Sequence, residues 1–254
     1  MLKGDESMKD KQHPLVFAHR GASGYAPENT MASFEKAVEL GTDGFELDVQ
    51  LTADGELVVI HDEWLERVSN GTGYVKDYTY EQLKQFNFNK TFPQYGPQQI
   101  PLLKEVLQLV RKAGIMVNIE LKTGIFHYPG IVEKTLQLVD EMGLRDSVIY
   151  SSFNHQTCVD IKKIQPDAYV GFLYDDGIID VRQYVKDHGG DAIHPAFYML
   201  QYPEHAIEAK KLGLEINTWT VNEPEHIEMA CKLGVDIIIT NYPDRAREIV
   251  KRYK

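Results

Sequence analysis

Short apolar runs alternate with amphipathic stretches along nearly the whole chain, and most of the amphipathic stretches end in glycine. The junctions stand at Gly41, Gly114, Gly143, Gly213 and Gly234. Glycine is the residue that best accommodates the left-handed conformation found just after a helix. Each junction therefore predicts a helix that ends and a buried strand that follows. Repeated junctions of this kind are typical of a parallel sheet with helices packed outside it.

The apolar runs predict nine strands. They cover residues 15–18, 45–49, 57–60, 117–121, 148–151, 169–173, 192–194, 215–220 and 236–240. Residues 52–55 leave no room for a crossover helix, so we expect the third strand to return antiparallel beside the second. Eight parallel strands remain, and 254 residues is the usual length of one such barrel. The expected fold is an α/β (β/α)8 barrel of the TIM type.

Periodicity and turn position predict finer features of this barrel. Apolar residues at helical spacing predict helices over residues 28–40 and 223–233, among others. A turn at Asp54 and Gly55 joins the second and third strands. If the two strands pair symmetrically about this turn without a bulge, His61 lies opposite Asp48.

The connection at residues 62–100 is too long for an ordinary loop of this fold. It is rich in aromatic residues, namely Trp64, Tyr74, Tyr78, Tyr80, Phe86, Phe88, Phe92 and Tyr95. Such a composition disagrees with a solvated linker. We expect a small insertion that packs over the strand ends and forms one wall of the pocket. The expected organisation is a tail at residues 1–14 and one barrel domain at residues 15–254, with the insertion at about 62–100.

The charge balance of the chain is acidic, with 27 Lys and Arg against 38 Asp and Glu and a net charge of -11. The average field repels nucleic acid and anionic membrane surfaces, so neither is an expected partner. No amphipathic membrane anchor is evident, and we expect no stable membrane association. An anionic small molecule would need local positive charge or a metal ion. The sequence carries no indication of the oligomeric state.

The N-terminal residues contain no apolar run of the length that a signal peptide or a membrane span requires. Cys158 and Cys231 show no spacing that suggests a zinc site or a disulfide framework. We therefore expect two buried thiols and a cytoplasmic location. The internal Met8 leaves room for a leader that has been removed, in which case the location differs.

Three acidic residues fall at predicted strand ends. Glu46 and Asp48 are two apart in one strand, so they project to the same face, and Glu120 comes from the neighbouring strand. Carboxylates that share a buried face repel one another unless a cation holds them. Three carboxylates describe a site for a hard divalent cation, Mg²⁺ or Ca²⁺, better than a zinc site. The alternative is that these acids form core salt bridges with Arg20 or Lys122.

His19 and His61 lie at strand ends beside these acids and are candidates for an acid/base pair. Arg20 can hold a phosphoryl oxygen through two hydrogen bonds, and Lys122 can supply a point charge beside it. A single histidine at a strand end is more often structural, but two that flank three acids favour catalysis. Trp219 could form an apolar wall for the carbon face of a substrate, although simple core packing explains it equally well.

Residues 19–62, HRGASGYAPENTMASFEKAVELGTDGFELDVQLTADGELVVIHD, resemble the signature of the glycerophosphodiester phosphodiesterase family. The resemblance continues in order through the chain. It includes IPLLKEVL at residue 100, VNIELK at 117, SSF at 151, INTWTV at 216 and IITNYP at 238. It implies a (β/α)8 barrel with a small insertion, the fold already expected from the strand pattern.

Residue by residue, the resemblance implies that Glu46, Asp48 and Glu120 ligate the metal and that His19 and His61 are the acid/base pair. It implies phosphate contacts for Arg20 and Lys122, and it places Glu28 and Asn29 close to the site. Glu28 would equally suit a helix N-terminus. The chain departs from many relatives at Asn241, where they have Asp. We expect this departure to affect only peripheral contacts.

The activity that the resemblance implies is metal-dependent hydrolysis of a small-molecule glycerophosphodiester to glycerol 3-phosphate and an alcohol. A cyclic phosphate intermediate is the expected route. Two alternatives remain, namely a phosphodiesterase of the lysophospholipase D type and a glycerophosphodiester-binding barrel without turnover.

Overall fold

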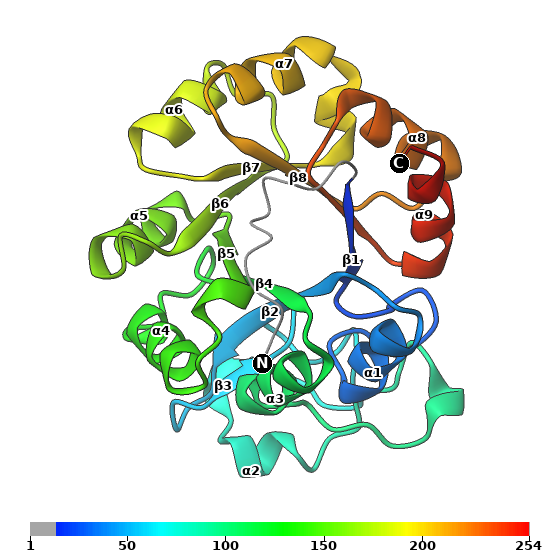
Figure 1. The fold of residues 1–254 in the computed structure, drawn as a ribbon. Helices are drawn as coiled ribbons and strands as arrows, with labels where there is room; N and C mark the ends of the chain where they lie inside the picture. The colour runs from blue at the N-terminus through cyan, green and yellow to red at the C-terminus, as the bar shows by residue number, and fades with distance from the viewer. Residues whose placement is uncertain (1–13, 254) are drawn as a thin grey trace.

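In the computed structural model, which describes residues 14–253, eight parallel strands close into a barrel (Figure 1). They are β1 (Leu15–His19), β2 (Gly44–Leu51), β4 (Met116–Leu121), β5 (Val148–Ser152), β6 (Tyr169–Tyr174), β7 (Ala192–Pro195), β8 (Glu215–Thr218) and β9 (Ile237–Thr240). Pairing of β1 with both β9 and β2 closes the ring, and the short strand β3 (Leu57–Val59) pairs antiparallel with β2. The expected barrel is confirmed. The expected tail at residues 1–14 lies, apart from Pro14, outside the described residues.

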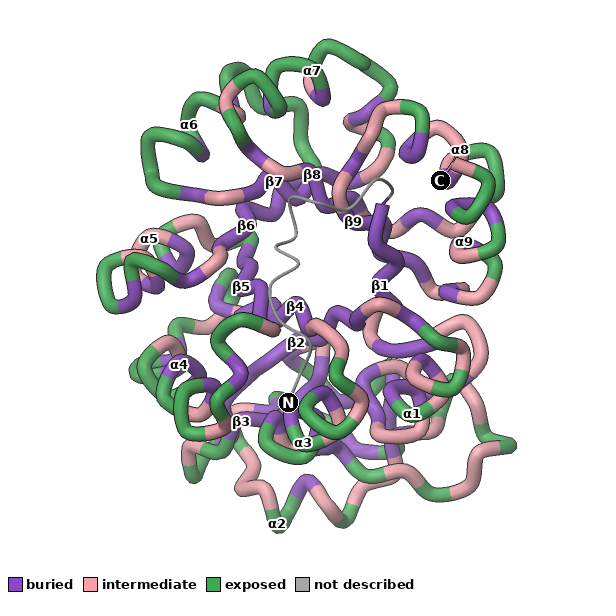
Figure 2. Tube along the Cα trace, in the orientation of Figure 1, coloured by how far each residue is buried: buried purple, intermediate pink, exposed green. Residues whose placement is uncertain are grey.

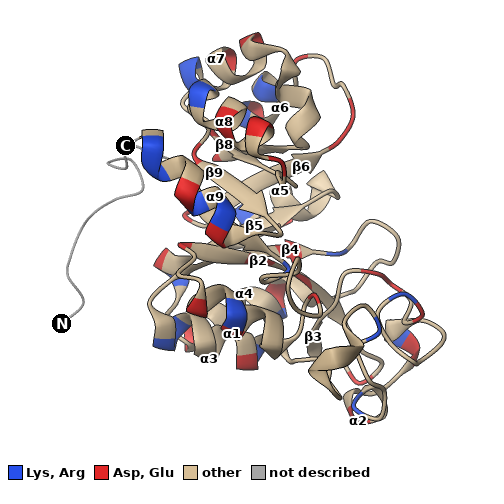
Figure 3. Ribbon diagram, turned by 90° about the vertical axis from the view of Figure 1, so that its right-hand side faces the viewer, with Lys and Arg blue, Asp and Glu red and all other residues tan. Residues whose placement is uncertain are grey.

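Helices surround the barrel. They are α1 (Met31–Glu39), α3 (Leu103–Ala113), α4 (Ile131–Glu141), α5 (His155–Ile164), α6 (Val181–Asp187), α7 (Pro203–Lys211), α8 (Pro224–Leu233) and α9 (Pro243–Val250), with α2 (Tyr80–Leu83) between β3 and α3. The strands are buried and the outer helix faces are exposed (Figure 2). Charged residues of both signs are distributed over the surrounding helices (Figure 3). The largest apolar cluster joins the outward strand residues to the inner helix faces.

Helix α1 begins three residues later than the sequence pattern predicts. Thr30 caps it, because its side chain accepts a hydrogen bond from the backbone N–H of Ser33. Asn29 has a φ of 54°, in the left-handed region, so the helix cannot extend back through it. Glu28 and Asn29 therefore lie in the loop before the helix, where their side chains turn toward the barrel instead of completing a first turn.

The pairing of β2 with β3 differs from the expected register by one residue. Val49 pairs with Val59, and the N–H of Thr52 donates to the carbonyl of Glu56, which closes a three-residue loop rather than a two-residue turn. Gly55 adopts a φ of 78°, as such loops require. Ile60, not His61, consequently lies opposite Asp48. His61 stands one residue further along, past the end of the strand.

The segment after β3 has an apolar cluster of its own. Its buried members are Val58, Ile60, Leu65, Val68, Val75, Leu83, Phe88 and Ile100. Tyr78 and Phe86 pack edge to face beside it at 5.4 Å between ring centroids. This packing explains why a segment with so little regular structure is rich in aromatic residues. In Figure 3 the segment that carries α2 lies beyond β3, at the lower right.

A glycine on β6 gives a first testable prediction. A Cβ atom on Gly171 would lie 2.0 Å from Nε2 of His194, whose ring is fully buried on the neighbouring strand β7. We expect Gly171→Ala to lower the free energy of unfolding by about 1–3 kcal/mol or more, because the buried ring can yield only by giving up its contact with Asn217. Thermal denaturation measures this effect. Gly177→Ala is the control, since a Cβ there meets nothing within 4 Å. Equal melting temperatures for the two variants would contradict the prediction.

Candidate active site

Polar side chains gather at the carboxyl ends of the barrel strands, where enzymes of this fold carry their sites. His19 ends β1, Glu46 and Asp48 lie on β2, Glu120 lies on β4, and His61 follows β3. A pocket opens to solvent here. It is lined by His19, Arg20, Glu46, His61, Asn118, Glu120, Phe153, Leu173, Trp219 and Ile239.

The three acids that the sequence singled out lie together. Glu46, Asp48 and Glu120 bring carboxylate oxygens within 4.8 Å of one another, and all three residues are buried. Asp48 and Glu120 are neighbours in the register of β2 and β4. Glu46 shares the face of Asp48 because side chains alternate along a strand. The strand geometry alone thus brings three carboxylates to one point.

The three carboxylates give this cluster an excess of negative charge, which shifts their pKa values. Burial and the neighbouring Asp48 raise the pKa of Glu46 well above its usual value. Burial also raises the pKa of Glu120, in spite of Lys122. For Asp48, burial is outweighed by His61, Arg20 and Lys122, which lower its pKa. Oδ1 of Asp48 is buried and accepts no hydrogen bond from the described residues. A cation between the carboxylates would satisfy these groups.

Two basic side chains compensate part of that charge. Nε of Arg20 lies 3.4 Å from Oδ2 of Asp48, and Nζ of Lys122 lies 2.9 Å from Oε1 of Glu120. The salt bridges considered as an alternative to a metal site are therefore present for two of the three acids. Glu46 accepts a hydrogen bond from the backbone N–H of Arg20. Three acids against two bases leave the cluster able to attract a cation.

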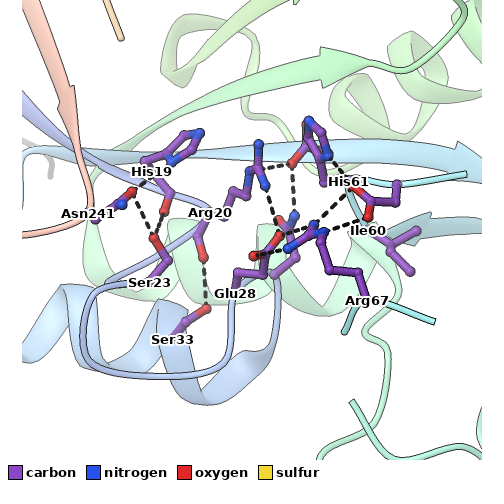
Figure 4. A network of polar contacts seen from close by, with 12 residues as sticks. His19, Arg20, Ser23, Glu28, Ser33, Ile60, His61, Arg67 and Asn241 are labelled. Carbon is purple, nitrogen blue, oxygen red and sulfur yellow. Dashed lines mark hydrogen bonds and ion pairs between the residues drawn. The ribbon is translucent and has the colours of Figure 1, made fainter. Parts of the chain in front are cut away.

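Each of the two histidines is held by a side chain behind it (Figure 4). Nδ1 of His61 donates to Oδ1 of Asp62 at 2.6 Å, and Nδ1 of His19 donates to Oδ1 of Asn241 at 2.8 Å. Both rings therefore keep Nε2 available on the side of the carboxylates. Nε2 of His19 lies 4.0 Å from Glu46, and Nε2 of His61 lies 3.2 Å from Nζ of Lys122. Burial and Arg20 lower the pKa of His19 to about 3.

The expectation that Asn241 has only a peripheral role is corrected by this contact. Its side chain lies directly behind His19, and the hydroxyl of Ser23 donates to the same oxygen at 3.0 Å. Sequence position gave no sign of it, because Asn241 and His19 are 222 residues apart. The neutral amide orients the ring without supplying a negative charge.

Arg20 and Asn29 are held in left-handed backbone conformations, with φ of 55° and 54°. Such conformations are costly for residues with a side chain, Arg more than Asn, and they cluster at functional sites. Nη1 of Arg20 donates to Oε1 of Glu28 at 2.9 Å, and Nδ2 of Asn29 donates to Oδ2 of Asp48 at 2.8 Å. Glu28 thus holds Arg20, which lines the pocket, and Asn29 holds Asp48, which is fully buried and not among the lining residues.

The apolar side of the pocket contains the expected Trp219 and also Phe153, which was not expected. Trp219 lines it, and its indole N–H donates to the carbonyl of His194. Phe153, which sequence reasoning did not single out, packs edge to face against Trp219 at 5.4 Å and is 40% exposed. Among the described residues, the side chains that line the pocket all lie outside residues 62–100. The insertion therefore does not form a wall of the pocket.

Gln50 on β2 is a further residue that the sequence did not single out. It is fully buried, and Nε2 lies within 3.2 Å of three successive carbonyl oxygens, those of Ile60, His61 and Asp62. Its Oε1 accepts a hydrogen bond from the hydroxyl of Tyr128. Gln50 therefore fixes the backbone of the turn that carries His61. The only sign of Gln50 in the sequence is its spacing, because it lies two residues after Asp48 and therefore on the same face of the strand.

Two further histidines near the strand ends, His155 and His194, do not line the pocket. Nε2 of His155 bonds to the carbonyl of Leu173 at 2.8 Å. Nε2 of His194 contacts Nδ2 of Asn217 at 2.8 Å, and burial lowers its pKa to about 3. Both rings therefore make contacts within the barrel wall and do not reach the pocket.

Comparison with known proteins identifies the family to which this chain belongs. The model of the glycerophosphoryl diester phosphodiesterase family matches residues 19–245. The chain belongs to this family. A glycerophosphodiester phosphodiesterase of Caldanaerobacter subterraneus subsp. tengcongensis is 44% identical over 94% of this chain and 98% of its own length. One of Bacillus altitudinis is 42% identical over 94% and 99%. As a family member the chain is an enzyme, a phosphoric diester hydrolase.

A solved structure of the family shares the fold closely. A phosphodiesterase of Oleispira antarctica, in complex with its product sn-glycerol-3-phosphate, has a TM-score of 0.84 and 26% identity, covering 94% of this chain and 97% of that one. No described helix of this chain is both long and apolar enough to cross a membrane. Cys158 and Cys231 are free and buried, as expected.

Proposed function

We propose that this chain hydrolyses glycerophosphodiesters to glycerol 3-phosphate and an alcohol in the pocket described above. The observation that carries the proposal is the convergence of three buried carboxylates with two histidines, Arg20 and Lys122. The product held by the Oleispira antarctica relative supports this substrate class. Purified protein should release choline and glycerol 3-phosphate in equal amounts from glycerophosphocholine. Release of neither product, with Mg²⁺ and with Ca²⁺, would contradict the proposal.

Glu46, Asp48 and Glu120 are the proposed ligands of one divalent cation. A set of carboxylates without cysteine or histidine suits a hard cation, Mg²⁺ or Ca²⁺. The buried Oδ1 of Asp48, without a hydrogen bond among the described residues, and the raised pKa of Glu46 both fit this role. When bound, such a cation neutralises phosphate charge and lowers the pKa of an oxygen that it contacts.

Arg20 and Lys122 are the proposed phosphate-binding residues. Arg20 presents a planar guanidinium and Lys122 a point charge, and both lie beside the carboxylates. Glu28 and Asn29 act behind them, through the hydrogen bonds to Arg20 and Asp48. Trp219 offers an apolar surface for the carbon atoms of the substrate.

His19 and His61 are the proposed acid/base pair. One histidine takes the proton of the glycerol hydroxyl next to the phosphodiester, and that oxygen forms a new bond to phosphorus. The bond from phosphorus to the alcohol breaks, and the second histidine gives its proton to the departing oxygen. Water then opens the resulting cyclic phosphate, with the histidine roles reversed, and glycerol 3-phosphate leaves. The intramolecular step is favoured because well-oriented groups reach effective molarities of about 10⁵ M or more.

A substrate analogue tests this route. A glycerophosphocholine analogue that lacks the hydroxyl next to the phosphodiester should bind, because its phosphate contacts are intact, but turn over very slowly. Steady-state kinetics give its turnover, and competition against glycerophosphocholine gives its affinity. Hydrolysis of the analogue at a rate comparable with the parent would show that water attacks phosphorus directly. The proposed metal and histidine roles could survive that outcome.

A phosphodiesterase of the lysophospholipase D type is the second candidate. The exposed ring of Phe153 at the pocket favours it, since an acyl chain could lie against this ring. Activity on glycerophosphocholine beside lysophosphatidylcholine distinguishes the two substrates. Metal-dependent turnover of either substrate dismisses the third candidate, a barrel that binds glycerophosphodiesters without hydrolysing them.

The domain organisation and the location are part of the proposal. We treat residues 15–254 as one catalytic domain that carries the insertion at about 62–100. The separate apolar cluster of the insertion and its contacts with the rim support these bounds. The cytoplasmic location stays a prediction, and the predicted cation stays Mg²⁺ or Ca²⁺.

A further inference from the structure

Arg67, a residue of the insertion, lies between two carboxylates at the rim of the barrel (Figure 4). Its Nη1 and Nη2 donate to Oε2 and Oε1 of Glu28 at 2.7 and 2.8 Å. Its Nε and Nη2 donate to Oδ2 and Oδ1 of Asp62 at 2.5 and 3.0 Å. One guanidinium group thus makes two bidentate contacts, one along each of two edges.

Both carboxylates also hold a proposed site residue. Oε1 of Glu28 accepts from Nη1 of Arg20 at 2.9 Å, and Oδ1 of Asp62 accepts from Nδ1 of His61 at 2.6 Å. The five side chains therefore form one unbroken series of charged contacts. It runs from the phosphate-binding arginine to one of the two histidines, and Arg67 is its central member.

The geometry of this series depends on a planar cation at its centre. Glu28 and Asp62 carry like charges, and their side chains are only 16% and 14% exposed. Water screens the repulsion between such charges poorly, so the two carboxylates need the positive charge of Arg67 between them. Hydrogen bonds from His61 and Arg67 outweigh burial and lower the pKa of Asp62. A lysine could neutralise the two acids but could not make paired parallel hydrogen bonds to both.

The insertion fixes the backbone that carries this arginine. Leu65 and Val68, on either side of Arg67, are buried in the insertion's own apolar cluster. Four N–H groups of Arg67 donate to Glu28 and Asp62, so both edges of its guanidinium that carry Nη2 are occupied by these carboxylates and not free for a substrate. Any effect that it has on turnover must pass through the residues that it holds.

We propose that Arg67 is a positioning residue, through which the insertion holds Arg20 and His61 in their working orientations by way of Glu28 and Asp62. This inference rests on the roles proposed above for Arg20 and His61. It gives the insertion a purpose other than the wall expected from its sequence. The insertion completes the site by supplying the cation that two rim carboxylates need.

The test is the kinetics of Arg67→Met on glycerophosphocholine with saturating Mg²⁺. We expect kcat to fall by about 10- to 100-fold, the scale on which misplacing a catalytic group by 1 Å acts. We expect KM to rise as well, since Arg20 binds the phosphate. Partial unfolding would lower the apparent kcat and leave KM unchanged, so the joint change separates positioning from a loss of folded protein. Circular dichroism at the assay temperature confirms the fold.

Two further variants sharpen the test. Arg67→Lys keeps the charge and loses the paired hydrogen bonds, so we expect it to recover little of the activity. Arg145→Met is the matched control, because Arg145 also makes paired contacts to one carboxylate, Asp140, and is 49% exposed at its side chain. We expect the kcat and KM of this control to stay within about twofold of the parent, as is usual for surface ion pairs. Full recovery with lysine would overturn the inference.

A double variant tests the path through Asp62. If Arg67 acts on His61 through this carboxylate, Arg67→Met should reduce kcat much less in an Asp62→Asn background than in the parent. Undiminished, multiplicative losses would overturn the inference. His61→Ala is assayed in parallel. An inactive His61→Ala beside a fully active Arg67→Met overturns this inference alone, whereas an unimpaired His61→Ala overturns the proposed function and this inference with it.

Discussion

We expect excess EDTA to abolish the hydrolysis of glycerophosphocholine, and Mg²⁺ or Ca²⁺ to restore it. The physical reason is the cluster of Glu46, Asp48 and Glu120, whose carboxylates outnumber the two basic side chains beside them. A phosphate anion cannot approach three buried acids unless a cation compensates them. Activity assays before and after chelation measure the effect. Full activity in excess EDTA would remove the metal from the mechanism.

Glutamine variants of the proposed ligands test the site itself. We expect Glu46→Gln and Glu120→Gln to weaken metal binding in isothermal titration calorimetry, because each removes a negative ligand. Without metal, Glu46→Gln should be at least as stable as the parent, since it relieves repulsion from Asp48. Glu133→Gln, on the exposed face of α4, is the control and should leave metal affinity unchanged. Equal metal affinity in all variants would contradict the assignment.

We expect His19→Ala and His61→Ala each to lower kcat by about 10²-fold or more with the fold intact. This is the usual scale of general acid–base catalysis. Both rings keep Nε2 on the side of the carboxylates, and both donate through Nδ1 to a side chain that orients them. Single-turnover kinetics with saturating metal measure the loss at the chemical step.

The matched control for these variants is His188→Ala. His188 is exposed on the outside of the barrel and bonds to the carbonyl of Tyr184. It should keep the parent kcat. A histidine variant at position 19 or 61 that behaves like this control would remove that residue from the mechanism, while the other assignment would stand.

The local spacing of apolar residues predicts most of the fold. Strand residues alternate and helices repeat every 3.6 residues, so apolar spacing alone predicts the eight parallel strands and the antiparallel return of β3. The same alternation places Glu46 and Asp48 on one face. The parallel order of β2 and β4 then places Glu120 beside them. The convergence of three carboxylates could be predicted for this reason.

The predicted register of β2 with β3 and the predicted start of α1 were wrong, because both depend on the backbone conformation of single residues. The loop at Asp54 has three residues instead of two, which moves His61 one place beyond Asp48. The left-handed conformation of Asn29 starts α1 after Thr30 and leaves Glu28 free to reach Arg20 and Arg67. Neither conformation is specified by hydrophobic spacing.

The sequence by itself therefore determined the barrel, the end at which its polar residues gather and the acids that share a face. All three follow from periodicities that act within a few residues. Only the tertiary structure decided which side chain stands behind each reactive group. Asn241 reaches His19 across 222 residues and Arg67 reaches Glu28 across 39. No local periodicity links such distant positions, because the closure of the barrel and the packing of the insertion bring them together.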